Sequence, residues 1–145
     1  MFELHERLAA DCFWLGDFPA SRLLLMNDTH FPWYILVPRF VGARELYLLA
    51  EADQVQVLHE SSQLSRVIMN VHSGQKLNVA ALGNMVPQLH IHHIVRFSTD
   101  AAWPGPVWGK VTAEPYTQAK VVSLQQSLLA VMEAEAIEFQ VKQLS

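Results

Sequence analysis

The fold is decided by residues 77–96, which read LNVAALGNMVPQLHIHHIVR. Three of the seven histidines in the chain fall within four residues of this stretch: His90, His92 and His93. The pattern predicts a strand over residues 89–97, along which successive side chains point to opposite faces. Gln88, His90 and His92 would then share one face, and His93 would lie on the other face among apolar residues.

A row of imidazoles on one face of a strand is costly to bury unless each ring finds a hydrogen-bond partner. Imidazole titrates near neutrality and suits nucleophilic and acid–base chemistry. Three interpretations of this row therefore compete. It is a phosphate-attacking strand, a metal site built on His90 and His92 without an evident third ligand nearby, or a polar strand that faces solvent.

The sequence around this strand predicts an α+β fold with an antiparallel sheet. Apolar runs favour strands, a 3.6-residue period favours helices, and the segment 103–109, with two prolines and two glycines, favours a shaped loop. The expected strands are residues 21–27, 33–37, 76–82 and 89–97, and the expected helices are 52–72 and about 118–143. Residues 1–12 are expected to form a helical turn or two, broken by Gly16, Asp17 and Pro19.

Composition excludes several classes of protein. The 145 residues are sufficient for a single domain, 1–145, and the net charge of −4 without a Lys or Arg run argues against a nucleic-acid partner. The single cysteine, Cys12, excludes an internal disulfide and a multi-cysteine zinc site, which favours a reducing, cytoplasmic location. The first residues do not resemble a signal peptide, and no apolar run reaches 18 residues, so the sequence does not indicate a membrane-spanning segment.

Residues 77–96 resemble the signature of the histidine triad (HIT) superfamily, His-φ-His-φ-His-φ-φ, preceded by a Gly-Gln-Ser/Thr-like phosphate loop. Leu36-Val37-Pro38-Arg39 resembles the Val-Ile-Pro-Lys-type strand end of that family. Met26-Asn27-Asp28 with Pro32-Trp33, and the segment 103–109, are similar to a bacterial subgroup of short HIT-domain proteins. The resemblance covers about residues 20–97.

The resemblance implies a HIT-like fold with an antiparallel sheet of about five strands and two main helices, with a core over about 20–110. It also implies a homodimer whose sheet continues across the two-fold axis. The implied function is that of a nucleotide hydrolase or transferase, of the phosphoramidase or pyrophosphohydrolase type, which attacks the α-phosphate of a nucleotide conjugate. A nucleotide is then the partner, and the reaction needs no metal and no organic cofactor.

The resemblance also assigns roles to residues. The nucleophile matches His90, His92 stabilises charge on the phosphoryl oxygens, and Gln88 replaces the first histidine of the triad, where it orients neighbours without moving a proton. The residues expected to bind nucleotide or phosphate are Asn27 at the ribose, Asn78, Gly83, Asn84 and Met85. The leaving-group side is assigned to Trp33, Trp103 and Trp108.

Asn84 replaces the glutamine that is usual in the family, and Gln88, Met85 and Trp33 depart further from the family pattern. They leave open a second interpretation, in which the chain is a catalytically weak or inactive nucleotide-binding HIT module. His93 stands where the family has an aliphatic residue, and we expect it to be a satisfied histidine under a helix or at a subunit edge.

Overall fold

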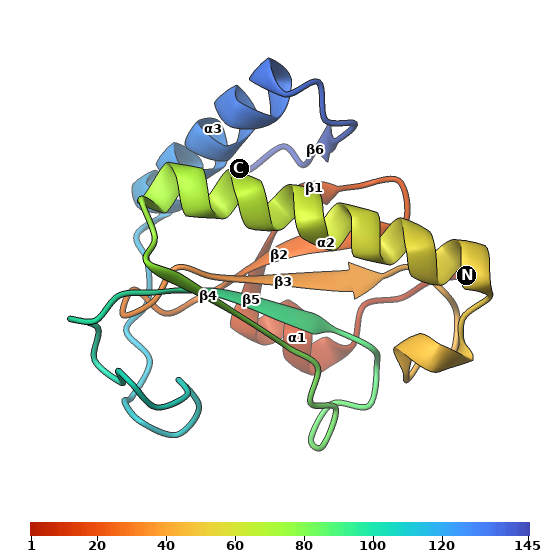
Figure 1. The fold of residues 1–145 in the computed structure, drawn as a ribbon, viewed down its shortest axis with the longest axis horizontal. Coiled ribbons are helices and arrows are strands. Elements are labelled where there is room, and N and C mark those ends of the chain that lie inside the picture. The colour runs from red at the N-terminus through yellow and green to blue at the C-terminus, as the bar shows by residue number, and fades with distance from the viewer.

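The computed structural model describes all 145 residues and has the expected α+β architecture (Figure 1). Its antiparallel sheet has six strands in the order β4-β5-β3-β2-β1-β6. The strands are β1 (Cys12–Asp17), β2 (Ser21–Met26), β3 (Trp33–Pro38), β4 (Lys76–Ala80), β5 (Ile91–Arg96) and β6 (Gln140–Val141). The helices are α1 (Glu6–Asp11), α2 (Glu51–His72) and α3 (Gln118–Ala134), with a 3-10 turn at Leu46–Leu48.

The central hairpin forms as the sequence predicts. β2 and β3 pair in antiparallel fashion from Ser21 opposite Pro38 to Leu25 opposite Tyr34. β3 is buried along its whole length, and β5 pairs with its other edge, so that His92 lies opposite Ile35. The histidine strand is therefore an interior strand, held on both sides by neighbours.

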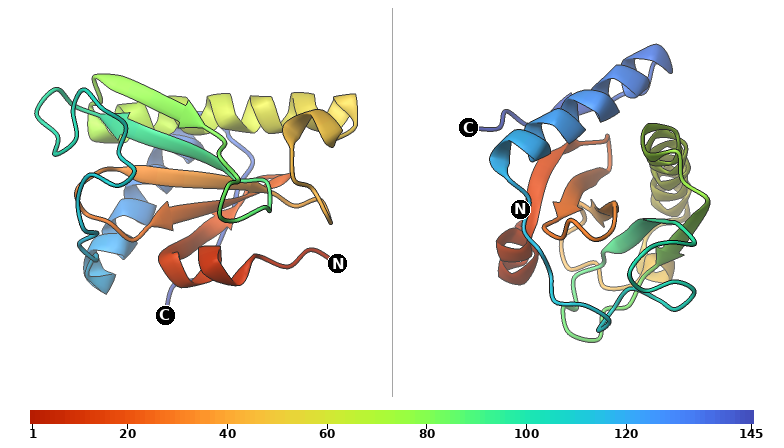
Figure 2. Two further views of the ribbon diagram at one scale, coloured as in Figure 1. Left: turned by 90° about the horizontal axis from the view of Figure 1, so that it is seen from below. Right: turned by 90° about the vertical axis from the view of Figure 1, so that its left-hand side faces the viewer.

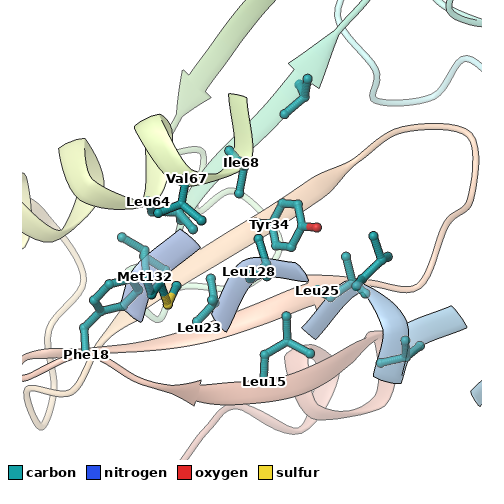
Figure 3. Packing of buried hydrophobic residues seen from close by; sticks show 14 residues of the cluster. Leu15, Phe18, Leu23, Leu25, Tyr34, Leu64, Val67, Ile68, Leu128 and Met132 are labelled. Carbon is teal, nitrogen blue, oxygen red and sulfur yellow. The ribbon is translucent and has the colours of Figure 1, made fainter. Parts of the chain in front are cut away.

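Helices α2 and α3 cover one face of the sheet (Figures 1 and 2). Leu64 and Ile68 of α2 and Leu128 of α3 pack with Leu23 and Tyr34 of the central strands in the larger core cluster (Figure 3). Apolar side chains at three- and four-residue spacing give each helix one apolar stripe, and burying that stripe on the sheet stabilises both layers.

The opposite face carries α1 and the long loops. Leu8 of α1 packs with Leu24 and Ile35 of the sheet, and with Val86 and Val107 from the two loops that flank β5. This second apolar cluster brings the N-terminal helix, the loop before β5 and the loop after it to the same face as His92.

One expectation about the N-terminal region was wrong. Residues 12–17 form β1, where the sequence predicted only breakers, and the sheet of about five strands that was expected has six. Gly16 does not end the element, because it lies in a bulge of β1 against the Phe139 ring, and a Cβ there would lie 2.4 Å from that ring.

The C-terminal helix is also shorter than expected. It ends at Ala134 and not near residue 143, and Ala136 then adopts a left-handed conformation with φ 53°. Ile137 and Phe139 extend the apolar pattern that predicted a longer helix, but they pack against the core from a segment that follows the helix. The chain then forms β6. The two strands of the motif are shorter as well, since β4 ends at Ala80 and β5 begins at Ile91.

No helix combines the length and the apolar character that crossing a membrane requires.

Candidate active site

A cavity of about 360 Å³ lies beside the histidine strand, on the sheet face that carries α1. Four parts of the chain wall it: α1, the end of β2, the loop 81–90 with the start of β5, and the loop 97–109. Its lining residues are Arg7, Leu8, Asp11, Met26, Leu82, Gly83, Asn84, Met85, Val86, His90, His92 and Trp108. We call this cavity the histidine pocket.

The ring of His90 is held in one tautomer. Its Nδ1 lies 2.6 Å from the backbone carbonyl oxygen of Gln88. A carbonyl oxygen only accepts, so Nδ1 must carry the proton and donate it. The neutral ring therefore has its lone pair on Nε2, and no hydrogen bond within the protein occupies that atom. His90 presents a free imidazole lone pair to the pocket.

The ring of His92 is held in the opposite tautomer. The indole Nε1 of Trp33 donates to Nδ1 of His92 at 2.9 Å, and an indole N–H can only donate. The proton of the neutral ring therefore lies on Nε2. Burial, together with the nearby rings of His90 and His93, lowers the pKa of His92 to about 3. His92 is therefore a neutral hydrogen-bond donor at physiological pH.

The two rings meet edge to face, with centroids 5.0 Å apart. Trp108 closes one side of His92, with its ring centroid 5.1 Å away and nearly perpendicular. The lone pair of His90 can attack an electrophilic centre, while the N–H of His92 donates to a partly negative oxygen bonded to that centre. A phosphoryl group combines both features.

His93 faces the other side of the sheet, as expected. Its Nδ1 donates to the carbonyl oxygen of Ile91 at 3.0 Å, and its Nε2 accepts from the hydroxyl of Ser61 on α2 at 2.7 Å. The side chain is fully buried, and burial lowers its pKa to about 4. This confirms that His93 is a satisfied histidine under a helix.

The loop before β5 supplies the second wall of the pocket. Gly83 has φ 75°, a left-handed conformation that favours glycine, and Asn84 and Met85 follow it along the lining. Met85 is largely exposed, and it offers no hydroxyl to an anion. The structure thus brings these three sequence-predicted residues together with His90 and His92.

The side chain of Gln88 lies outside the pocket. Its Oε1 accepts from the backbone N–H of His5 at 2.9 Å, and its Nε2 donates to the carbonyl oxygen of Glu3 at 2.8 Å. Because β5 begins only at Ile91, Gln88 does not share a strand face with the two pocket histidines. Only its carbonyl group, which accepts from His90, acts on the pocket directly.

Asn27 and Asn78 also have other partners. Asn27 Oδ1 accepts from the backbone N–H of Tyr116 at 2.8 Å, and its neighbour Met26 lines the pocket instead. Asn78 Oδ1 accepts from the guanidinium of Arg96 at 2.8 Å. Asn27 thus ties the end of β2 to the segment before α3, Asn78 joins β4 to the last residue of β5, and neither side chain lines the pocket.

Arg96 is buried and organises the loop 97–109. Its guanidinium makes two hydrogen bonds to the carboxylate of Asp100 and a third to the carbonyl oxygen of Gly105. Burial alone would raise the pKa of Asp100, but hydrogen bonds from Arg96 and from the backbone of Phe97 and Ala102 outweigh it and lower that pKa to about 2. This ion pair shapes the loop that brings Trp108 to His92.

The three tryptophans assigned to the leaving-group side have different places. Trp108 lines the pocket, whereas Trp33 lies behind His92 and acts through its hydrogen bond. Trp103 is 40% exposed and lies outside the pocket lining, with the Arg96 guanidinium 5.7 Å from its ring centroid.

Sequence reasoning missed the wall contributed by α1. Arg7, Leu8 and Asp11 line the pocket, although they are about 80 residues from the histidines in sequence. The apolar residues of this segment predicted a helical turn, but no local pattern indicated that the turn folds over the motif.

No group of three or more His, Cys, Asp or Glu side chains is arranged to hold a metal ion. The metal interpretation thus gains no third ligand, and Nδ1 of His92 is already bonded to Trp33.

The HIT domain family model matches residues 7–99 of the chain. Three solved bacterial structures are also similar over nearly the whole chain. A histidine triad protein from Marinobacter aquaeolei is 54% identical, with a TM-score of 0.89, and the match covers 92% of this chain and 98% of that one. A histidine triad protein from Bradyrhizobium japonicum is 42% identical, with a TM-score of 0.87 and coverage of 89% and 96%.

The third structure, a histidine triad protein from Sinorhizobium meliloti, is 35% identical, with a TM-score of 0.88 and coverage of 90% and 96%. Among curated proteins, none is significantly similar to this chain.

Proposed function

This chain belongs to the HIT domain family, and from that membership we propose that it is a nucleotide hydrolase or transferase in which His90 attacks the α-phosphorus of a nucleotide conjugate. The observation that carries the proposal is the pair of opposite tautomers in the pocket. His90 offers a lone pair on Nε2, and His92 offers an N–H on Nε2.

In the proposed reaction, Nε2 of His90 forms a bond to phosphorus while the bond from phosphorus to the leaving nitrogen or oxygen breaks. The N–H of His92 donates to a phosphoryl oxygen, whose negative charge grows in the transition state. The carbonyl of Gln88 keeps Nδ1 of His90 protonated and accepts a stronger hydrogen bond as the ring becomes positive. The leaving group takes a proton from solvent as it departs. Water then attacks phosphorus, the bond from phosphorus to Nε2 breaks, and the proton lost by the water passes to solvent, which releases the nucleoside monophosphate and restores His90.

Loop 81–86 is the proposed phosphate-binding wall. Gly83, Asn84 and Met85 line the pocket next to His90, and backbone N–H groups near a left-handed glycine can approach an anion closely. Trp108 is the proposed wall on the leaving-group side. Direct contacts of Asn27, Asn78 and Trp103 with the nucleotide stay predictions. Each of these side chains now has another partner, which it would have to leave in order to reach the nucleotide.

The second candidate is a nucleotide-binding module with little or no catalysis. It is favoured by the placement of Gln88, because the amide is bonded to Glu3 and His5 and offers no proton to the leaving group. The exposed thioether of Met85, in place of a hydroxyl, points in the same direction.

Incubation with adenosine 5′-phosphoramidate and with a dinucleoside polyphosphate distinguishes the two candidates. We expect release of AMP by the wild-type protein, and a covalent nucleotidyl adduct that mass spectrometry detects at His90. Saturable AMP binding without release of AMP from either substrate would select the binding module. Absence of both binding and turnover would overturn both candidates.

We propose further that the protein is a homodimer that joins its sheets through β4. β4 is an edge strand of the sheet, and Val79 on it is 51% exposed. The unpaired backbone N–H and C=O groups of an edge strand invite pairing with a second strand. Light scattering should give a mass of about twice 16.4 kDa, and a particle of 16.4 kDa at micromolar concentration would contradict the dimer.

A cytoplasmic location also belongs to this proposal. Its support is that the single cysteine, Cys12, can form no disulfide within the chain, as is usual for proteins of a reducing compartment.

A further inference from the structure

The histidine pocket contains one permanent positive charge, and it comes from outside the histidine motif. Arg7 of α1 is the only lysine or arginine among the lining residues. His92 is neutral and therefore adds no second positive charge to the pocket. A phosphate-bearing ligand in this pocket would therefore meet Arg7 as its one guanidinium partner.

The present partner of Arg7 holds it only weakly. Its Nε donates to Asp11 one helical turn away at 3.0 Å, with 65% of the Arg7 side chain and 46% of the Asp11 side chain exposed. Exposed pairs of this kind contribute little to stability. No hydrogen bond engages the two terminal nitrogens of the guanidinium, which are therefore available to a phosphate.

The position of Arg7 is fixed through Gln88. The amide of Gln88 holds the backbone at Glu3 and His5, and Nδ1 of His5 in turn accepts from the backbone N–H of Arg7 at 3.1 Å. The carbonyl of the same Gln88 holds the ring of His90. One residue thus fixes the distance between the nucleophile and the helix that carries the cation.

We propose that Arg7 binds a phosphate of the substrate beyond the one that His90 attacks, and that Gln88 is a positioning residue that holds Arg7 at the pocket. The proposal rests on the proposed function, and it predicts that nucleotides with two or more phosphates are preferred to nucleotides with one. Arg7 comes from α1, whereas the residues proposed to bind the α-phosphate come from β5 and the loop before it.

The test compares the binding of AMP with that of the methylene-bridged analogue of ADP, which cannot be cleaved between its phosphates. Isothermal titration at fixed ionic strength gives both dissociation constants. We expect Arg7→Gln to weaken binding of the ADP analogue about tenfold and binding of AMP less than twofold, as the loss of one charge-assisted hydrogen bond predicts.

Arg66→Gln is the matched control. Arg66 is on α2, 59% of its side chain is exposed, and it faces Glu135 at 3.9 Å, so its removal changes the net charge equally without touching the pocket. It should leave both dissociation constants unchanged. Equal weakening of AMP and the ADP analogue by Arg7→Gln, or no weakening of either, would overturn the role of Arg7.

Gln88→Ala tests the positioning role. We expect faster hydrogen exchange at the amides of His5 and Arg7, and a loss of preference for the ADP analogue that matches Arg7→Gln. The control is Gln75→Ala, since Gln75 also bonds a distant backbone N–H, that of Ser98, but far from the pocket lining. Faster exchange with an unchanged ratio of dissociation constants would show that Gln88 is merely structural.

Binding and turnover by the wild-type protein distinguish a failure of the proposed function from a failure of the role of Arg7. If the wild-type protein binds neither AMP nor the ADP analogue at millimolar concentration, the inference is overturned, and if it also releases no AMP from either test substrate, the proposed function is overturned as well. If it binds AMP but shows no dependence on Arg7, only the inference is overturned.

Discussion

The indole N–H of Trp33 fixes the tautomer of His92. The hydrogen bond between Trp33 Nε1 and His92 Nδ1 is 2.9 Å long, and both side chains are buried. Since Trp33 can only donate, Nε2 of His92 must carry the ring proton. A tryptophan of β3 therefore sets the hydrogen-bonding role of a histidine in the pocket.

Trp33→Phe tests this relationship. Phenylalanine retains an aromatic ring but removes the donor, so both tautomers of His92 become accessible and the fraction with Nε2–H falls. We expect kcat on adenosine 5′-phosphoramidate to fall about tenfold, equivalent to about 1.4 kcal/mol of transition-state stabilisation. Nitrogen NMR of the His92 ring reports the tautomer directly.

Trp108→Phe is the control for that measurement, because Trp108 contacts the same ring edge to face without a hydrogen bond. It should leave the His92 nitrogen shifts unchanged. An unaltered tautomer in Trp33→Phe would contradict the assignment.

His90→Ala should abolish turnover and leave the fold intact. His90 lines an open cavity and has one hydrogen bond, so its removal should cost at most about 1 kcal/mol of stability. Loss of the nucleophile should lower kcat at least about a thousandfold. Product assays and urea titrations of the same variant measure both quantities.

His93→Ala should behave in the opposite way. It empties a fully buried site and leaves Ser61 Oγ and the Ile91 carbonyl without their partner, which should cost about 2–4 kcal/mol. Turnover per folded molecule should persist. A large loss of stability in His90→Ala, or loss of turnover in fully folded His93→Ala, would reverse the two assignments.

Much of the fold could be predicted because the spacing of apolar residues within single segments indicates their secondary structure. The hairpin of β2 and β3, helix α2 and the histidine strand follow from apolar spacing within single segments. β1 could not be predicted, because Gly16 serves a close approach to Phe139, a residue more than 120 positions away.

The histidines and the adjacent loop of the pocket could be predicted from the sequence, whereas the wall formed by α1 could not. His90, His92 and the loop 83–85 lie together because they are neighbours in sequence. The partners of Gln88, Asn27 and Asn78 are tertiary contacts with backbone or side-chain groups 18 to 89 residues away, and no motif specifies them. An amide side chain binds whichever donor or acceptor the fold presents.

Arg96→Lys should destabilise the protein by about 2–4 kcal/mol, since a lysine cannot replace a buried guanidinium with four hydrogen bonds to Asp100, Asn78 and Gly105. Urea titration measures the loss. Arg66→Lys is the control, because 59% of the Arg66 side chain is exposed and its nearest carboxylate oxygen, on Glu135, is 3.9 Å away, so this substitution should cost less than about 1 kcal/mol. Equal effects of the two substitutions would contradict the role given to burial.

Stability should fall as the pH drops from about 6.5 to 4. Burial lowers the pKa of His72 and His93 to about 4 and, with neighbouring rings, that of His92 to about 3, whereas an unfolded histidine titrates near 6.5. Between these values the unfolded chain binds more protons than the native protein. Each such proton lowers the free energy of unfolding by up to about 1.4 kcal/mol per pH unit.

Urea titrations at half-unit steps from pH 7.5 to 4 measure this slope. We expect the slope of the unfolding free energy against pH to correspond to between one and three protons near pH 5, and to be small above pH 7. His72 should contribute less to this slope than His92 and His93, because its side chain is partly exposed to solvent. His93→Gln removes one titrating ring and should reduce the slope by about one proton. A free energy of unfolding that stays constant down to pH 4.5 would show that these rings accept protons in the native state.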